Sequence, residues 1–189
     1  AREGFGQRVD LSSDVALGLV GFILDRASGY FRDQGYSAEE VESVLDLYRA
    51  SDLPVSQLLP RLAAIKQFRA LPEAASLIEA NKRSRNILTK EKVADLAHSV
   101  NASALTEPSE RTLHEVMVEL GPVVQHHVAC REFDSALRAL ARLRDHVDRF
   151  FSEVRVVVAD DAVRTNRFAL LLELNTLLNR VANISRLSA

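Results

Sequence analysis

Apolar residues recur with helical spacing near the end of this sequence, and that pattern constrains the fold more than any other feature. Successive members are separated by four, three, four and three positions: Leu170, Leu174, Leu177, Val181 and Ile184. This spacing puts them on one face of an α-helix, whereas a strand would need apolar residues at every second position. We predict one helix over 161–185, which must pack this face against other elements.

One step back along the same face stands Arg167. A guanidinium buried without a partner would be costly, so an inward-facing arginine needs a carboxylate close by. Asp148 lies near the end of the preceding predicted helix, and we predict that it is this carboxylate. The expectation is therefore a structural ion pair between Arg167 and Asp148.

The rest of the chain also has the composition and periodicity of a helical protein. Only 7 Gly and 5 Pro occur among 189 residues, and such sparing use of turn-forming residues favours long helices. In the first predicted helix we expect an inward face of Val15, Leu19, Phe22, Ile23 and Tyr30. The helices predicted before the last one span about 12–34, 37–52, 55–70, 72–88, 109–130 and 134–151.

Local signals refine these boundaries. Gly35 is a natural helix stop, and Ser37 with Glu40 forms a capping box that begins the second helix. Pro122 should kink its helix because it removes an amide donor. Val154–Val158 is the one strand candidate, but it lacks a pairing partner, so we expect an extended connector.

Residues 89–108 are the least patterned stretch, and we expect a loop or hinge there with one helical turn at 93–97. We place a domain boundary in this stretch, between a smaller N-terminal helical domain (1–100) and a second helical domain (101–189). The predicted fold class is all-α, a helical bundle, preceded by an irregular lead-in over residues 1–11.

Charge and cysteine content restrict the class of protein. The net charge of −2 argues against a protein that coats nucleic acid indiscriminately, so we expect no DNA partner. A single cysteine, Cys130, excludes an internal disulfide and fits a reducing compartment. There is no apolar run of the roughly 18 residues that span a bilayer, and no signal peptide. We therefore expect a cytoplasmic protein without a membrane partner, and a fragment or processed chain, because it begins at Ala1.

Catalytic and metal-binding patterns have little support. His126, His127 and Cys130 could share a helix face and hold a metal, but isolated helical His and Cys are usually packed or solvated. The sequence has no Gly-rich phosphate loop and no zinc-type cysteine pairing. Asp145-His146 reverses the pair used by metal-dependent phosphohydrolases, and no second pair exists. We predict no catalytic residue and no metal site in this chain.

Short strings over almost the whole chain, among them Phe22–Arg26 and Gly35-Tyr36, resemble one family. They match DALR-type anticodon-binding domains of aminoacyl-tRNA synthetases, and more closely the β subunits of bacterial glycyl-tRNA synthetases. Asp161–Arg164 corresponds to the Asp-Ala-Leu-Arg string that names the family, with Val163 in place of Leu. The other matching strings are Ala80–Leu88, Val147–Phe151, Asn166–Leu171 and Arg180–Ser185. Gly121-Pro122 has no counterpart that we can place in the family pattern.

The resemblance implies tRNA binding, as the anticodon-recognition part of the β subunit. It implies glycine tRNA and an α subunit as partners, with ATP and Mg used by the α subunit and no cofactor in this segment. The segment would support attachment of glycine to tRNA as a fragment of the ligase without catalysing it. The alternative is a non-catalytic helical scaffold that only docks protein partners.

Two groups of residues are candidate RNA contacts. Lys82, Arg83 and Arg85 lie in a basic run, where they either form a solvated helix end or contact RNA phosphates. Arg155, Arg164 and Asn166 cluster where the connector meets the last helix, which suits unstacked anticodon bases. Glycine anticodons end in two cytosines, whose exocyclic amines need acceptors. Asp160, Asp161 and connector carbonyls are the acceptors that we expect near those bases.

Overall fold

The computed structural model describes residues 13–51, 53–93 and 99–189, without side-chain detail for 13–20 and 25. This part contains helices and no strands, which confirms the all-α prediction. The predicted lead-in over 1–11 and nearly all of the predicted turn at 93–97 lie outside these residues. The α-helices are α1 (Ser13–Asp33), α2 (Ala38–Ala50), α3 (Leu58–Phe68), α4 (Ala74–Lys90), α5 (Pro108–Ala129), α6 (Phe133–Ala141), α7 (Arg144–Glu153) and α8 (Asp161–Leu178). Short 3-10 turns are η3 (Val55–Gln57), η4 (Ala102–Ala104) and η5 (Ile184–Arg186).

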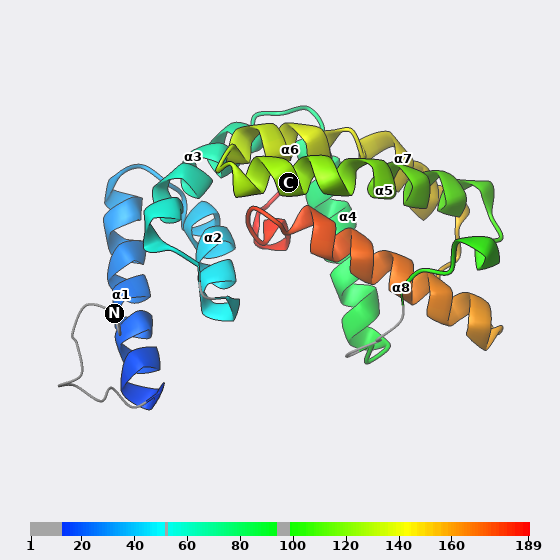
Figure 1. Cartoon of the computed structure of the whole chain (residues 1–189), viewed down its shortest axis with the longest axis horizontal. Helices are drawn as coiled ribbons and strands as arrows, with labels where there is room; N and C mark the ends of the chain where they lie inside the picture. Colours follow the sequence, from blue (N-terminus) through cyan, green and yellow to red (C-terminus); the bar gives the residue numbers. More distant parts are fainter. Residues whose placement is uncertain (1–12, 52, 94–98) are drawn as a thin grey trace.

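The helices form an arch (Figure 1). Helices α5, α6 and α7 run along its top, α1 and α2 form its left side, and α8 lies below the top layer. Helix α4 packs against α7 and α8, and α3 packs against α6. The buried apolar residues of all eight helices join in one continuous core. The division predicted near residue 100 therefore separates helices that share a packed interface, and it stays a prediction.

Several helix ends follow from the local signals in the sequence. The capping box is present, because Ser37 Oγ accepts from the Glu40 amide at 3.2 Å and Glu40 accepts from the Ser37 amide at 2.8 Å. Gly35 has φ +83°, a left-handed conformation that favours glycine after a helix end. Asp160 caps α8 by accepting two backbone N–H bonds. Helix α5 continues through Pro122, and the predicted kink there stays a prediction. Residues 154–158 form no strand, as expected, but only Val154 is shown to be extended, and the chain bends at 156–157.

Two predicted helix spans were wrong. The segment 134–151 is broken at Arg142-Leu143 into α6 and α7, and α8 ends at Leu178 rather than continuing to 185. The side chain of Asn179 donates to the Asn175 carbonyl at 2.8 Å and accepts from the Ile184 amide at 3.0 Å. The Asn175 carbonyl also accepts the helical bond from the Asn179 amide at 3.1 Å, so the Asn179 side chain joins the end of α8 to the turn that follows. Val181 and Ile184 are still buried, so the apolar spacing predicted burial correctly beyond the real helix end.

The inward face predicted for α1 was also wrong where the structure describes its side chains. Phe22, Ile23 and Tyr30 are exposed by 58%, 42% and 60%, whereas Leu24 and Phe31 are buried. The first helix packs mainly on α2, which covers only one of two possible apolar stripes. Val15 and Leu19 of the same prediction lie among residues whose side chains are not described.

Candidate nucleic-acid interface

Arg167 is buried at the start of α8, as its position on the apolar face predicts, but its partner is Glu110 rather than Asp148. Its Nε donates to a carboxylate oxygen of Glu110, one of its terminal nitrogens donates to the Arg155 carbonyl at 2.8 Å, and the other donates to Thr106 Oγ1 at 3.2 Å. Glu110 is 1% exposed and also accepts from the Thr106 and Glu107 amides at 2.9 Å. This pair joins the starts of α5 and α8.

Asp148 was the wrong choice because it faces another helix. It accepts a hydrogen bond from Ser76 Oγ of α4 and lies 3.6 Å from the Arg144 guanidinium. Its proximity to Arg167 in sequence carried no information about which side of α7 it occupies. Glu110 lies 57 positions away from Arg167, so only the three-dimensional packing reveals this pair.

The other residues at this end of α8 also have partners within the chain. Arg164 pairs with Asp161 and donates to the Val158 carbonyl at 2.8 Å. Asn166 binds the backbone of Asn101 twice, accepting from its amide at 2.8 Å and donating to its carbonyl at 3.0 Å. Base reading by Arg164 and Asn166 stays a prediction, but it would require these bonds to be broken or shared.

The cationic side chains of α4 have fewer hydrogen-bond and ion-pair partners within the chain. Lys82 pairs with Glu79 at 3.0 Å, and Arg85 donates to Ser185 Oγ at 3.0 Å. The exposed Arg83 guanidinium stacks over the Phe151 ring, with its carbon 4.5 Å from the ring centroid. Phe151 is half-buried, whereas Phe150 belongs to the core. Because guanidinium planes also stack on nucleobases, Arg83 on its aromatic support is a ready stacking surface.

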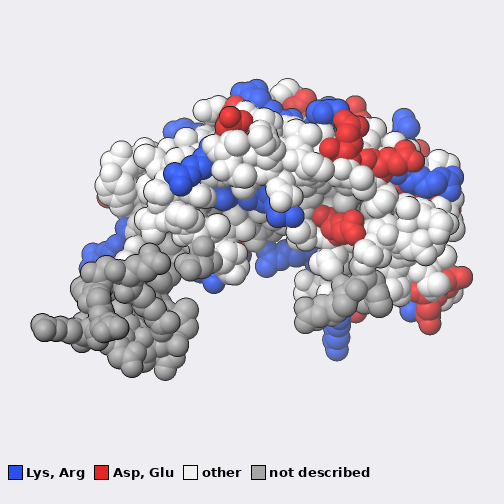
Figure 2. Space-filling view, in the orientation of Figure 1, with Lys and Arg blue, Asp and Glu red and all other residues white. Residues whose placement is uncertain are grey.

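The structure distributes the predicted residues over three places. Lys82 and Arg83 line one surface hollow on α4, and Arg85 lines another, between α4 and α8. Arg155, Arg164 and Asn166 lie apart from both, around the start of α8; Arg155 is exposed. Figure 2 shows several basic side chains on the inner side of the arch.

Two polar residues with structural roles were missed by the sequence reasoning. Asn81 is fully buried, and its side chain hydrogen-bonds Asn175 of α8 at 2.7 Å and Asn179, the residue after α8, at 2.8 Å. Arg61 is 2% exposed, donates to the Arg180 and Val181 carbonyls, and lies over the Phe133 ring. Burial lowers the pKa of the Arg61 guanidinium from its ordinary value. The only feature of the sequence that could have indicated these buried roles is a polar residue at a position where the apolar pattern of a helix continues.

Among the described residues no group of three or more His, Cys, Asp and Glu side chains is arranged to hold a metal. The two histidines considered above interact locally: His126 Nε2 lies 3.8 Å from Cys130 Sγ, and His127 Nδ1 lies 2.7 Å from Glu132. None of the helices in the described ranges combines the length and hydrophobicity that crossing a membrane requires.

Comparison with known proteins identifies the class. The family model described as the DALR anticodon binding domain matches residues 77–185, from α4 to η5. The chain therefore belongs to the DALR anticodon-binding domain family, as its motifs suggest.

Its relatives include glycine–tRNA ligase β subunits. The subunit of Methylobacillus flagellatus is 42% identical over 95% of this chain, and that of Ralstonia nicotianae is 43% identical over 90% of it. The subunit of Aromatoleum aromaticum is 39% identical over the whole of this chain. The chain spans about a quarter of the length of these relatives, from 24 to 26%.

Proposed function

We propose that this chain binds the anticodon loop of glycine tRNA, as part of a glycine–tRNA ligase β subunit. Membership of an anticodon-binding family is the observation that carries the proposal, and the relatives' names supply the amino acid. The chain then supports attachment of glycine to tRNA within an assembly with the α subunit. We place ATP and Mg use, and the chemical steps, in the α subunit.

The basic face of α4 supplies the phosphate contacts. Arg83 and Arg85 have no carboxylate partner among the described residues, whereas most cations of α6 and α7 do. Lysine and arginine contacts to phosphates position the RNA without choosing its sequence. Lys82, Arg83 and Arg85 are the contacts proposed on α4, and Arg155 is proposed at the connector.

Titration against a glycine anticodon stem-loop at several salt concentrations tests this proposal. Each lost phosphate contact should weaken binding to all loops alike and reduce the slope of log affinity against log salt by about one. We expect this of Arg83→Ala and Arg85→Ala. Arg138→Ala is the matched control, because Arg138 is an exposed arginine of α6 paired with Asp134. Equal slopes for all three variants and the parent would contradict the assignment.

Protein docking stays the second candidate function, and one observation favours it. Ile23, Tyr30, Val55 and Leu59 expose apolar surface along one side of α1, η3 and α3. Docking through such a surface should respond weakly to salt, whereas phosphate binding should weaken steeply as salt rises. A chain that binds no RNA at low salt would favour docking as its function.

A further inference from the structure

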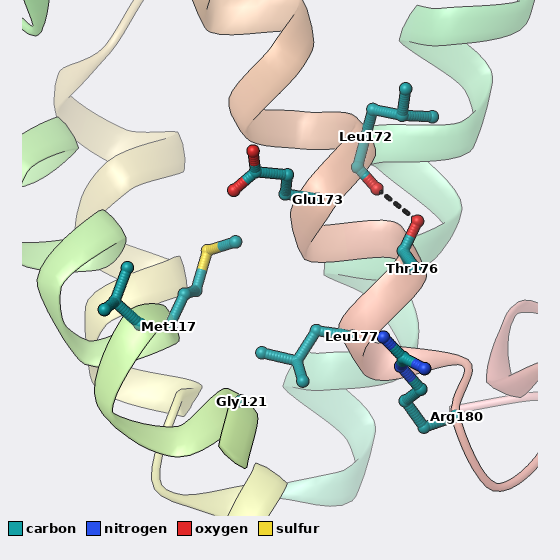
Figure 3. Close-up of a pocket in the computed structure, with 8 residues that line it drawn as sticks. Met117, Gly121, Leu172, Glu173, Thr176, Leu177 and Arg180 are labelled. Carbon is teal, nitrogen blue, oxygen red and sulfur yellow. Dashed lines mark hydrogen bonds between the residues drawn. The ribbon is translucent and has the colours of Figure 1, made fainter. Parts of the chain in front are cut away.

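A surface hollow between α5 and α8 combines apolar walls with two charged side chains, Glu173 and Arg180, that have no ion-pair partner among the described residues. Its volume is about 350 Å³, near the lower end of the range of roughly 300–1,000 Å³ for small-molecule pockets. Met117 and Leu177 point into it, and Gly121 contributes no side chain (Figure 3). An added Cβ at Gly121 would meet nothing within 4 Å, so this part of the wall is open.

Glu173 supplies a hydrogen-bond acceptor in this hollow. It is half-buried and points from α8 into the space beside Met117 (Figure 3). One carboxylate oxygen accepts from the Val100 amide at 3.0 Å, which fixes the side chain. The second oxygen has no hydrogen-bond partner, and no cation pairs with Glu173, among the residues that the structure describes. A carboxylate accepts several hydrogen bonds, so this one retains capacity for a ligand.

Arg180 supplies donors at the other end. It lies seven residues beyond Glu173 in sequence and two residues past the end of α8. Its carbonyl accepts from the buried Arg61, which anchors the backbone while the guanidinium stays exposed. No carboxylate within ion-pair distance of Arg180 was found in the described ranges.

We infer that this hollow receives a cytosine of the anticodon, read by Glu173 and Arg180. This inference rests on the proposed function, because glycine anticodons contain two cytosines. The exocyclic amine of cytosine donates, which suits the free oxygen of Glu173, and carboxylates are suitable acceptors for this amine. The cytosine carbonyl accepts, which suits Arg180, and the base faces pack on Met117 and Leu177.

Other ligands fit this arrangement less well. A phosphate would lie against the Glu173 carboxylate. Uracil presents a carbonyl where cytosine has its amine, so two acceptors would face each other. Adenine shares the amine but lacks the carbonyl for Arg180. Asp160 and Asp161, the acceptors predicted from sequence, lie at the start of α8 and do not line this hollow.

The test is a titration of the parent chain, Glu173→Gln and Arg180→Met against anticodon stem-loops that differ at one cytosine. The loops carry cytosine, uracil or adenine at that position, and each cytosine is replaced in turn. Glutamine keeps an acceptor for the Val100 amide and offers an amide donor that uracil can use. We expect Glu173→Gln to narrow the preference for cytosine over uracil by about tenfold.

Arg180→Met should leave the ratio of the affinities for the cytosine and uracil loops unchanged, because both bases carry the same carbonyl. It should reduce the ratio of the affinities for the cytosine and adenine loops, because adenine lacks that carbonyl. Gly121→Leu should fill the hollow and weaken the cytosine loop. Glu115→Gln, at an exposed carboxylate of α5, is the control that removes the same charge.

A parent chain that binds no loop would overturn the proposed function, and the inference with it. A parent that prefers cytosine, with a preference unchanged in Glu173→Gln and Gly121→Leu, would overturn the inference alone.

Discussion

The two ends of α8 use their polar side chains differently. At the start, Arg164, Asn166 and Arg167 all have partners within the chain. At the end, Glu173 keeps one free oxygen and Arg180 has no carboxylate partner among the described residues. The string that signals the family therefore lies in the part of α8 that holds the fold together. The groups best placed to contact a ligand lie outside that string.

Breaking the Arg167–Glu110 pair should have the largest effect. Arg167→Ala leaves a buried carboxylate without its cation, and such a loss costs about 3–5 kcal/mol of unfolding free energy. Denaturant melts measure this loss. The double variant Arg167→Met with Glu110→Gln should recover part of it, because no uncompensated charge remains. A midpoint of Arg167→Ala equal to that of the parent would show that this end of α8 does not depend on the pair.

Removing the Asn166 side chain should have a smaller effect on the same property. Asn166→Ala loses two hydrogen bonds to Asn101 and should cost about 1–2 kcal/mol of unfolding free energy. Asn86→Ala is the matched control for the gain in helix propensity, because Asn86 is exposed on α4. Equal melting midpoints for the two variants would mean that Asn166 does not hold the segment around Asn101.

The smallest expected effect concerns a contact away from both ends of α8. Burial raises the pKa of Asp46, but hydrogen bonds from Arg186 and Asn183 outweigh it and hold the pKa below its ordinary value. A depressed carboxyl pKa stabilises the fold above the unfolded-state value of about 3.9 and ceases to do so as pH falls through the folded value. Asp46→Asn should therefore lose stability at pH 7 relative to the parent.

The difference between Asp46→Asn and the parent should shrink as the pH falls below about 4. Melts of both proteins at pH 7 and at lower pH check this change. A difference that stays constant across the range would mean that the carboxylate charge contributes nothing.

The sequence predicted the features that depend on neighbouring residues. The capping box at Ser37, the stop at Gly35 and the helix start at Asp160 each follow from a few adjacent positions. The burial of Arg167 followed from apolar spacing, but its partner depended on the packing of α5 on α8. Helix α1 shows the same limit, because two apolar stripes were available and only the neighbouring helix decides which one is covered.

The candidate site was less predictable than the fold. Glu173 and Arg180 fall outside the motif strings or at their edge, and neither departs from what a surface helix normally carries. Their shared hollow exists because α5 passes alongside α8 and presents Gly121 and Met117 to it. Spacing within one helix places Glu173 and Leu177 on one face, but it says nothing of the opposite wall.

The division between the two ends of α8 can be tested in one paired measurement. For Asn166→Ala and Glu173→Gln, the denaturation midpoint is measured together with the ratio of affinities for the cytosine and uracil loops. We predict that Asn166→Ala lowers the midpoint and keeps the ratio, whereas Glu173→Gln keeps the midpoint and reduces the ratio by about tenfold. The reverse pattern, with discrimination lost in Asn166→Ala and intact in Glu173→Gln, would contradict this division.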